Sequence, residues 1–256
     1  MKTKPIILVT NDDGIIAPGI RALIRMMNTI GNVYVVAPDK PQSGMGHAIT
    51  VEIPLHGESV EIDQGPQQEW QCSGTPVDCI KLAIGQILPK RPDICVSGIN
   101  HGSNASVNVI YSGTMSAAVE AAIEGIPAIG FSLLDFSWEA DFKPAQKYVC
   151  QIVQKILEKG LPKDVSLNVN IPKIKEKEIK GIKICRQAKA RWKENFDKRL
   201  DPKGRTYYWL TGEFVNLDQK EDTDEWALAN RYISVVPIQF DLTAHASIQT
   251  LKSLEL

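Results

Sequence analysis

This chain of 256 residues has few histidines, little net charge, no C-x-x-C pair of cysteines and no long apolar run. Its five cysteines are spread between positions 72 and 185 without a C-x-x-C pair, which argues against a disulfide framework. None of the four histidines has a context that is typical of a cysteine enzyme, so we set thiol catalysis aside. We expect the cysteines to be buried apolar side chains in a reducing compartment.

The charge balance and the apolar runs argue against two further classes of protein. A formal net charge of −1 at pH 7 argues against a globally basic protein that binds nucleic acid. No stretch approaches the roughly 18 apolar residues of a membrane-spanning helix, and the run at residues 6–9 is shorter than the about 7–15 residues of a secretory signal. The sequence therefore predicts a cytoplasmic protein with no membrane association and no stable nucleic-acid complex.

Strand-like and helical patterns alternate through the first half of the chain. Short apolar runs lie at residues 6–10, 33–37, 94–97 and 128–133, and helical patterns begin at Pro18, Pro76 and Ser112. This alternation predicts an α/β fold with a Rossmann-like, doubly wound and mostly parallel sheet that has helices on both faces. Residues 47–55 and 59–63 interrupt the alternation and predict an inserted antiparallel hairpin.

The second half of the chain concentrates aromatic and charged residues. Eight aromatic residues lie within residues 189–232, and residues 173–205 hold 13 Lys or Arg against 5 acids. Three interpretations are open: a solvated hairpin with opposite charges paired across its strands, an arm that packs its rings on another subunit, and a basic patch for a polyanion. We favour the arm, because a long projecting segment has little core of its own in which to bury these rings.

Composition and length set the expected domain organisation. Hydrophobic residues make up 43% of the chain, which is ordinary for a globular protein, and a chain of this length buries roughly 70–75% of its unfolded surface. We expect a single domain over residues 1–256. Its core spans about residues 1–188 together with C-terminal strands at 233–251, and a projecting β-hairpin arm used in oligomerisation spans about residues 189–232.

Loops that follow three predicted strands are rich in carboxylate, hydroxyl and amide groups. They contain the pair Asp12 and Asp13, then Ser43, then Asn100. Ligands bind at the carboxyl ends of the strands in open α/β sheets. Two adjacent carboxylates repel each other unless a positive charge lies beside them, although such a pair can also cap a helix. With Ser43 and Asn100 at the same edge, the donors are hard oxygens, which favour Mg²⁺, Mn²⁺ or Ca²⁺ over Zn²⁺ or Cu²⁺.

A second polar segment, Ser112, Gly113 and Thr114, begins an alanine-rich helix. Free N–H groups, the positive end of a helix dipole and two hydroxyls form an anion site, although a plain helix cap is the alternative. Beside a metal site, we interpret the segment as a phosphate site with Asn104 as a further contact. The chain has no Walker A loop and no G-x-G-x-x-G motif, so nucleoside triphosphates and dinucleotides lose support.

Five ordered motifs within residues 6–134 resemble the SurE-type stationary-phase survival nucleotidases. They are LVTNDDG at 8–14, the segment 36–44, SGTPVD at 73–78, SGINHGSN at 97–104 and YSGT at 111–114, and a weaker resemblance continues through 222–224. The resemblance implies a metal-dependent phosphatase that acts on nucleoside monophosphates, with metal ligands at Asp12, Asp13, Ser43 and Asn100. It also implies a cytoplasmic homodimer or homotetramer with exchanged C-terminal elements.

Our hypothesis is hydrolysis of a phosphomonoester at a catalytic pair, Asp12 and Asp13. One Mg²⁺ or Mn²⁺ per subunit, held with Ser43 and Asn100, activates a water molecule, and Asn104, Ser112, Gly113 and Thr114 hold the phosphate. The expected substrates are 5′-nucleotides, with 3′-nucleotides and short polyphosphate as further candidates.

Several alternatives stay open at this point. Asp12 could attack phosphorus directly, although that chemistry usually has a second Asp two residues on, where this chain has Gly14. His101 is a candidate proton donor to the leaving group. A non-catalytic module that binds nucleotides or polyphosphate would keep the phosphate site without needing an acidic metal pair. A metal-dependent hydrolase of another ester or amide is compatible with the same fold.

Overall fold

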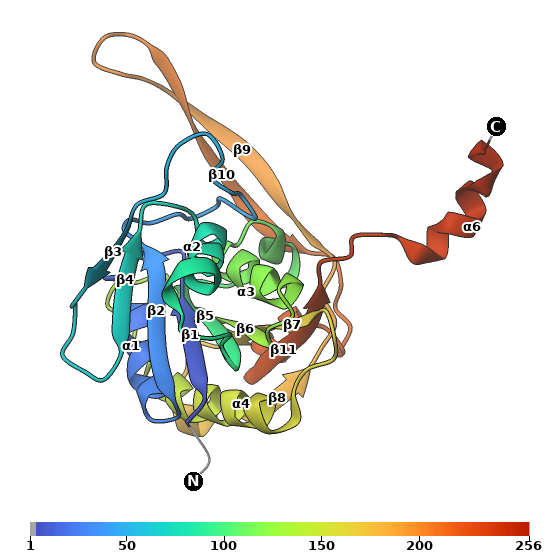
Figure 1. Cartoon of the computed structure of the whole chain (residues 1–256). Coiled ribbons are helices and arrows are strands. Elements are labelled where there is room, and N and C mark those ends of the chain that lie inside the picture. The colour runs from blue at the N-terminus through green and yellow to red at the C-terminus, as the bar shows by residue number, and fades with distance from the viewer. Residues whose placement is uncertain (1–3, 256) are drawn as a thin grey trace.

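The computed structural model describes residues 4–255, so residues 1–3 and 256 of the predicted domain lie outside the described residues (Figure 1). Its strands are β1 Ile6–Thr10, β2 Asn32–Pro38, β3 Gly57–Val60, β4 Gln68–Cys72, β5 Ile94–His101, β6 Ala128–Leu133, β7 Val165–Ile171, β8 Gly181–Ile184, β9 Ala190–Leu200, β10 Thr206–Asn216 and β11 Tyr232–Gln239. Its α-helices are α1 Pro18–Asn28, α2 Pro76–Leu82, α3 Gly113–Ile123, α4 Gln146–Lys159, α5 Asp224–Ala229 and α6 Ile248–Leu251.

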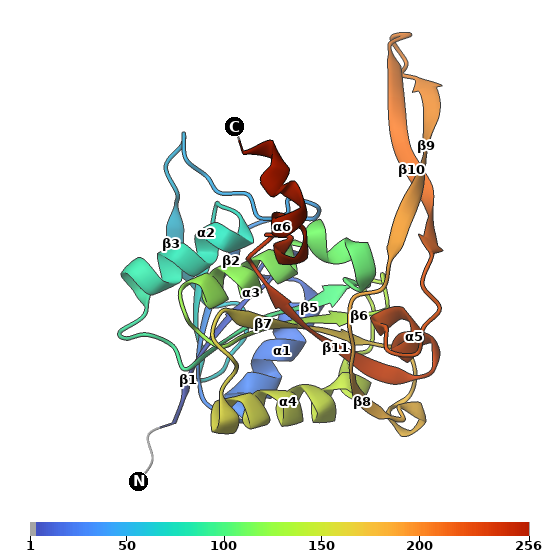
Figure 2. The same cartoon turned by 90° about the vertical axis from the view of Figure 1, so that its right-hand side faces the viewer.

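The main sheet has the strand order β3-β4-β2-β1-β5-β6-β7-β11-β8. The six strands from β4 to β7 run parallel, while β3 and β11 run antiparallel to their neighbours β4 and β7. Helices α1 and α4 cover one face and α2 and α3 cover the other (Figure 2). The α/β, doubly wound and mostly parallel fold predicted from the sequence is therefore confirmed.

Strand β1 shows why the central strands are apolar on both faces. Ile7 and Val9 pack into the core under α1 and α4, and Leu8, which points to the opposite face, packs under α2 and α3. A strand buried on both faces needs a continuous apolar run rather than an alternating one. Local signals fix the helix starts, because Pro18 lies in the first turn of α1 and Thr75 forms a capping box with Asp78 in α2.

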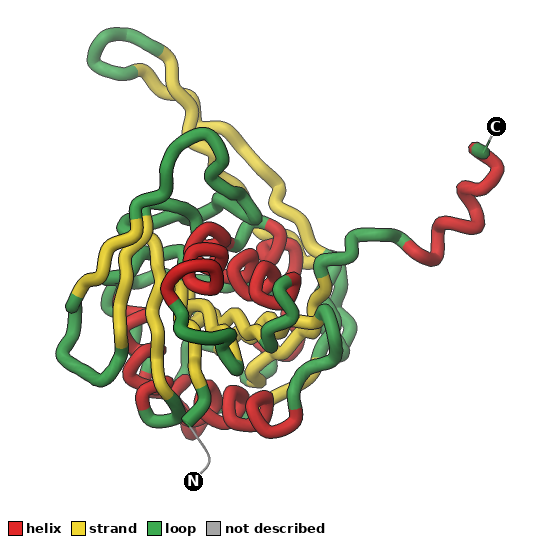
Figure 3. Tube along the Cα trace, in the orientation of Figure 1, coloured by secondary structure: helices red, strands yellow, loops and turns green. Residues whose placement is uncertain are grey.

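The predicted hairpin at residues 47–55 and 59–63 is wrong. Residues 47–55 form no strand and belong to the long loop between β2 and β3 (Figure 3), and β3 pairs instead with β4. The loop takes its hydrogen bonds from α2: Thr50 N–H donates to Asp78 at 3.1 Å, and the Thr75 hydroxyl donates to the Ala48 carbonyl at 2.7 Å. Helix-cap groups therefore replace the strand partner that the alternating sequence indicated.

Strands β9 and β10 form a separate antiparallel hairpin that projects from the body (Figure 1). The projecting part covers 190–216 rather than the predicted 189–232, because the chain then packs back onto the body through buried Ala227 and Leu228 of α5. Residues 233–251 contain one strand, β11, and not several. After it, Asp241 accepts the Thr243 N–H at 2.9 Å, and short helical turns follow to Leu254.

The structure bears on two further predictions, the state of the cysteines and the absence of a membrane-spanning helix. All five cysteines are free thiols and all but Cys150 are buried, as expected. Among residues 4–255 there is no helix with the length and apolar character needed to cross a membrane.

Candidate active site

The carboxyl ends of β1, β2 and β5 meet the first turn of α3 at one edge of the sheet. Strand β1 is flanked by β2 and β5 in parallel, so the segments after all three strands leave the sheet on the same side. The register of β5 against β6 shifts between Ser97 and Asn100, and such a bulge changes the direction of the strand end that carries Asn100.

Asp12 lies in the centre of this edge, with only 4% of its surface exposed. The Thr114 hydroxyl donates to its Oδ1, and the Thr114 backbone N–H donates to it as well. Gly113 allows this approach, because a Cβ at that position would lie 2.7 Å from the Asp12 Cβ. Burial, and then the charge of Asp13, raise the pKa of Asp12 to about 6.

Asp13 lies half-buried beside Asp12. Its Oδ2 accepts the His101 backbone N–H at 3.3 Å, and burial raises the pKa of this carboxyl above its ordinary value. Within the described part of the chain, neither carboxylate forms an ion pair with a Lys or Arg. Two adjacent acids kept from water without a cationic side chain fit a hard divalent cation, whose charge would offset their repulsion.

The loop that carries Ser43 is attached directly to Asp12. Gln42 N–H donates to the Asp12 carbonyl oxygen at 2.7 Å, and Ser43 is the next residue, exposed in a turn. Further along, His47 Nε2 lies 2.9 Å from Oε2 of the buried Glu120 in α3, and Lys81 pairs with the same carboxylate. The hydrogen bond from His47, followed by the one from Lys81, lowers the pKa of Glu120. His47 therefore anchors this loop.

Asn100 is half-buried at the end of β5. Its Nδ2 donates to the Gly102 carbonyl at 3.0 Å, which leaves the amide oxygen as the atom able to bind a cation. The next residue, His101, has its ring packed between aromatic side chains, and its Nδ1 donates to the Ser137 carbonyl at 2.8 Å. The ring of His101 is thus held through Nδ1 and its aromatic neighbours, while its buried Nε2 has no hydrogen-bond partner among the described residues, and its role as a proton donor stays a prediction.

The four residues predicted to hold phosphate lie at this edge, but the side chains of Asn104, Ser112 and Thr114 are engaged within the protein. The Ser112 hydroxyl accepts the Met115 N–H at 3.0 Å as the cap of α3, which is the plain alternative weighed above. Asn104 Nδ2 donates to the Ser132 hydroxyl at 2.9 Å, and Thr114 donates to Asp12. The backbone at Gly113 and the positive end of α3 are the parts of this segment best placed for an anion, and direct phosphate contacts stay a prediction.

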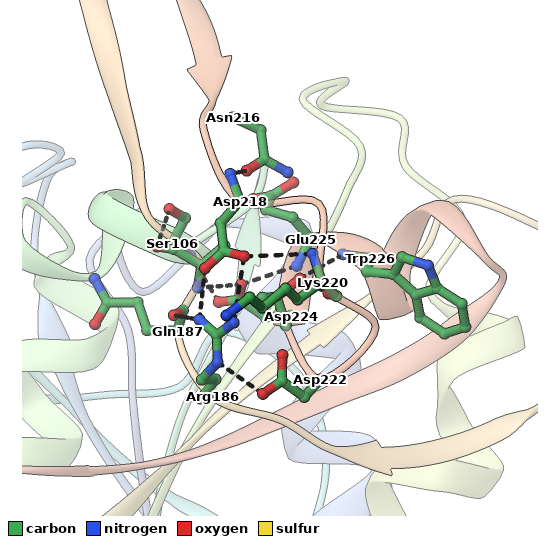
Figure 4. A network of polar contacts seen from close by, with 12 residues as sticks. Ser106, Arg186, Gln187, Asn216, Asp218, Lys220, Asp222, Asp224, Glu225 and Trp226 are labelled. Atoms are coloured by element: carbon green, nitrogen blue, oxygen red, sulfur yellow. Dashed lines mark hydrogen bonds and ion pairs between the residues drawn. The ribbon is translucent and has the colours of Figure 1, made fainter.

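Sequence reasoning missed a polar network at the base of the hairpin (Figure 4). Asp224, which is 0% exposed, accepts backbone N–H groups of Ser106 at 2.8 Å and Ala188 at 2.9 Å. Arg186 pairs with Asp218 at 2.6 Å and with Asp222 at 2.8 Å. Because Ser106 lies between the candidate phosphate residues 104 and 112, the hairpin base and the active-site loop share one buried carboxylate. The available signal was the short motif at 222–224.

Comparison with known proteins finds similar sequences along almost the whole chain. Residues 7–194 match the family model described as "Survival protein SurE". A protein named "5'-nucleotidase SurE" from Flavobacterium psychrophilum is 65% identical over 254 residues and covers 99% of both chains. One of the same name from Flavobacterium johnsoniae is 66% identical over 253 residues, which are 99% of this chain and 98% of the relative.

A solved structure agrees with this fold in detail. The crystal structure of the SurE protein from Aquifex aeolicus has a TM-score of 0.85 to this chain, at 42% sequence identity, and the match covers 98% of this chain and 100% of that one. A family match over most of the chain and relatives this similar along their full length show that the chain belongs to the SurE family of survival proteins.

Proposed function

We propose that this chain is a hydrolase that releases phosphate from nucleoside monophosphates, a 5′-nucleotidase that depends on a divalent metal ion. The observation that carries the proposal is the pair of buried Asp12 and half-buried Asp13, of which Asp12 contacts the first turn of α3 and neither forms an ion pair with a Lys or Arg in the described part of the chain. Family membership supports the reaction class, since the two relatives described above carry the name 5'-nucleotidase SurE. 3′-Nucleotides and short polyphosphate are further candidate substrates.

The residues proposed to hold one Mg²⁺ or Mn²⁺ per subunit are Asp12, Asp13, Ser43 and Asn100. When bound there, the ion supplies Lewis-acid polarisation of a phosphoryl oxygen and lowers the pKa of a coordinated water. All four residues offer hard oxygen atoms, as these ions prefer. For Ser43 the support is its neighbour Gln42, whose N–H donates to the Asp12 carbonyl oxygen.

Hydrogen bonds from neighbouring residues orient the two carboxylates. The Thr114 hydroxyl holds one carboxylate oxygen of Asp12, and the His101 N–H holds one of Asp13. The first turn of α3 places the positive end of its dipole beside Asp12, where it stabilises the charge of a phosphate. We place water rather than Asp12 as the nucleophile, because Thr114 occupies Asp12 Oδ1 and position 14 is glycine.

We also propose that the chain assembles as a homodimer or homotetramer through its projecting segments, and that it works in the cytoplasm. The hairpin exposes Tyr208 and Trp209, and the C-terminal segment exposes Leu242 and Leu254, although side chains of this kind are normally buried. Replacing Tyr208 and Trp209 by Lys is expected to lower the mass measured by light scattering while leaving the circular dichroism of the body intact. An unchanged mass contradicts a role of the hairpin in assembly.

The test of the activity is phosphate release from a panel of 5′- and 3′-nucleoside monophosphates and short polyphosphate, with Mg²⁺, Mn²⁺ or EDTA. We expect release that EDTA abolishes and that Asp12→Asn lowers by about 1000-fold or more, as loss of a metal-ligating charge implies. Asp164→Asn, at the opposite edge of the sheet, is the matched control. Absence of release with every metal, from folded protein, would favour a non-catalytic module that binds nucleotides.

A further inference from the structure

The loop after β6 carries two large aromatic side chains in solvent, Phe136 at 81% exposure and Trp138 at 57%. Strand β6 lies beside β5 with Ser132 opposite Asn100, so this loop leaves the sheet at the same edge as the proposed metal ligands. Together we call Phe136 and Trp138 the aromatic shelf. Two large exposed rings that lie together beside a candidate site fit a binding surface, because aromatic side chains combine a large apolar area with a defined geometry.

Hydrogen bonds fix the loop although its rings are exposed. The Gly102 N–H donates to the Leu133 carbonyl at 2.8 Å, and His101 Nδ1 donates to the Ser137 carbonyl at 2.8 Å. Asp135 accepts the Ser137 N–H at 3.1 Å and pairs with Lys173 at 2.9 Å. The rings are therefore positioned before any ligand arrives, which lowers the entropy cost of binding.

Each ring of the shelf is connected to a proposed metal ligand through one residue. A Cβ at Gly102 would lie 2.2 Å from Cε1 of Phe136, so this ring lies directly on Gly102, whose carbonyl accepts the Asn100 amide. Trp138 stacks on His101 with ring centroids 5.8 Å apart and planes 13° apart, and the His101 N–H donates to Asp13. The shelf is thus continuous with the site at Asp12 and Asp13.

We infer that the aromatic shelf is the subsite for the nucleobase of the substrate, an inference that rests on the proposed nucleotidase function. A nucleoside monophosphate presents an anion at one end and a flat aromatic ring at the other. With its phosphate held beside the proposed metal ligands Asp12 and Asn100, its base extends along the same edge toward Phe136 and Trp138. Stacking accepts every base because each has a π-face, so the shelf favours nucleotides as a class over phosphate esters that lack a base.

The experiment compares AMP and CMP with ribose 5-phosphate, which lacks the base, for the full-length protein with Mn²⁺. Phe136→Leu and Trp138→Leu are each expected to lower kcat/KM about tenfold for both nucleotides and to leave ribose 5-phosphate unchanged. Phe136→Tyr, which keeps the π-face, is expected to retain wild-type values. Phe240→Leu, an exposed phenylalanine beyond β11, is the matched control and is expected to change neither substrate.

Three results would overturn the inference. The first is an equal loss with nucleotides and ribose 5-phosphate, and the second is no loss with either. The third is a change of molecular mass on light scattering for Phe136→Leu, which would place the ring in an interface between copies of the chain.

If the wild type releases phosphate from no substrate, the proposed function fails separately. Calorimetry with adenosine alone then decides: binding weakened by Phe136→Leu supports the shelf, and no binding overturns it.

Discussion

The active-site edge and the projecting hairpin depart from the usual distribution of side chains in opposite ways. At the edge, polar groups such as Asp12 and Thr114 are buried, whereas on the hairpin aromatic rings such as Tyr208 and Trp209 are exposed. Burying a charge is costly unless something pairs with it, and exposing large apolar area is costly unless something covers it. Each region therefore fits the partner proposed for it, a cation at the edge and another subunit at the hairpin.

The two regions also differ in how they are held. The edge is fixed by contacts between segments far apart in sequence, such as Thr114 with Asp12, whereas the hairpin is held mainly by its own ladder from Ala190 to Asn216. The Asp224 network and the bond from Trp192 Nε1 to Asn108 at 2.8 Å connect the hairpin and its base with the active-site loop. Substitutions at the edge should therefore affect activity first, and substitutions at the hairpin base should affect stability first.

After Asp12→Asn, the largest effect is expected from Gly113→Ala, which places a Cβ 2.7 Å from the Asp12 Cβ and forces α3 away from that residue. We expect kcat/KM to fall by about 100-fold, as for other misplacements near 1 Å, with a loss of about 1–3 kcal/mol in the free energy of unfolding. Steady-state kinetics and urea unfolding measure the two effects. Gly85→Ala is the control, because an added Cβ there meets nothing within 4 Å, and equal behaviour of the two variants would contradict the argument.

Asp224→Asn should weaken the contacts that join the hairpin base to the active-site loop. The buried carboxylate accepts the N–H groups of Ser106, Ala188 and Glu225, and an amide cannot accept all three. We expect a loss of about 2–3 kcal/mol in the free energy of unfolding, measured in urea. Asp222→Asn, which alters an exposed ion pair with Arg186, should cost much less, because solvent screens that pair. Comparable losses from both variants would contradict this account, because the buried contacts of Asp224 would then add no more to the free energy of unfolding than the exposed ion pair does.

Thr114→Val should have a smaller effect that is confined to the edge. It removes the hydroxyl that donates to Asp12 while keeping the shape of the side chain. Loss of one charge-assisted hydrogen bond predicts a decrease of about tenfold in kcat/KM, with Thr114→Ser retaining most of the activity. If Ser and Val variants lose activity equally, packing rather than the hydroxyl holds Asp12.

The smallest effect is expected at Glu225, next to the buried Asp224. Burial, and then the charge of Asp224, raise the pKa of Glu225 from 4.5 to about 7. The unfolded chain releases this proton at the lower value and the folded chain at the higher one, so ionisation destabilises the fold as pH rises between them. Glu225→Gln is therefore expected to raise the free energy of unfolding by about 1 kcal/mol at pH 8 and by much less at pH 5. A gain that is equal at both pH values would contradict this origin, and Glu221→Gln, exposed on the same segment, is the control.

The sequence allowed the sheet to be predicted, and with it the edge that carries the candidate site, because both follow from local patterns. A continuous apolar run such as residues 6–10 signals a strand buried on both faces, and the residues that end such strands share an edge. Residues 47–55 show the limit: their alternating pattern predicted a strand, but Asp78 and Thr75 of another segment supplied the hydrogen bonds.

Long-range contacts set the remaining limits of sequence reasoning. Thr114 was predicted as a phosphate contact, and the structure shows that its hydroxyl donates to Asp12, 102 residues earlier in the chain. Asp224 could not be assigned a role, because its partners Ser106 and Ala188 lie 118 and 36 residues away. Local sequence reveals which groups can form hydrogen bonds, but the tertiary fold decides which partner each one meets.

The central claim is that buried Asp12 and half-buried Asp13 form a site for a divalent cation. Its most direct test is calorimetric titration of the metal-free protein with Mn²⁺, in parallel with Asp13→Asn and the distant control Asp164→Asn. The account predicts one ion bound per chain for the wild type and for Asp164→Asn, and loss of that binding for Asp13→Asn. Equal binding by all three proteins, or no binding by the wild type, would contradict it.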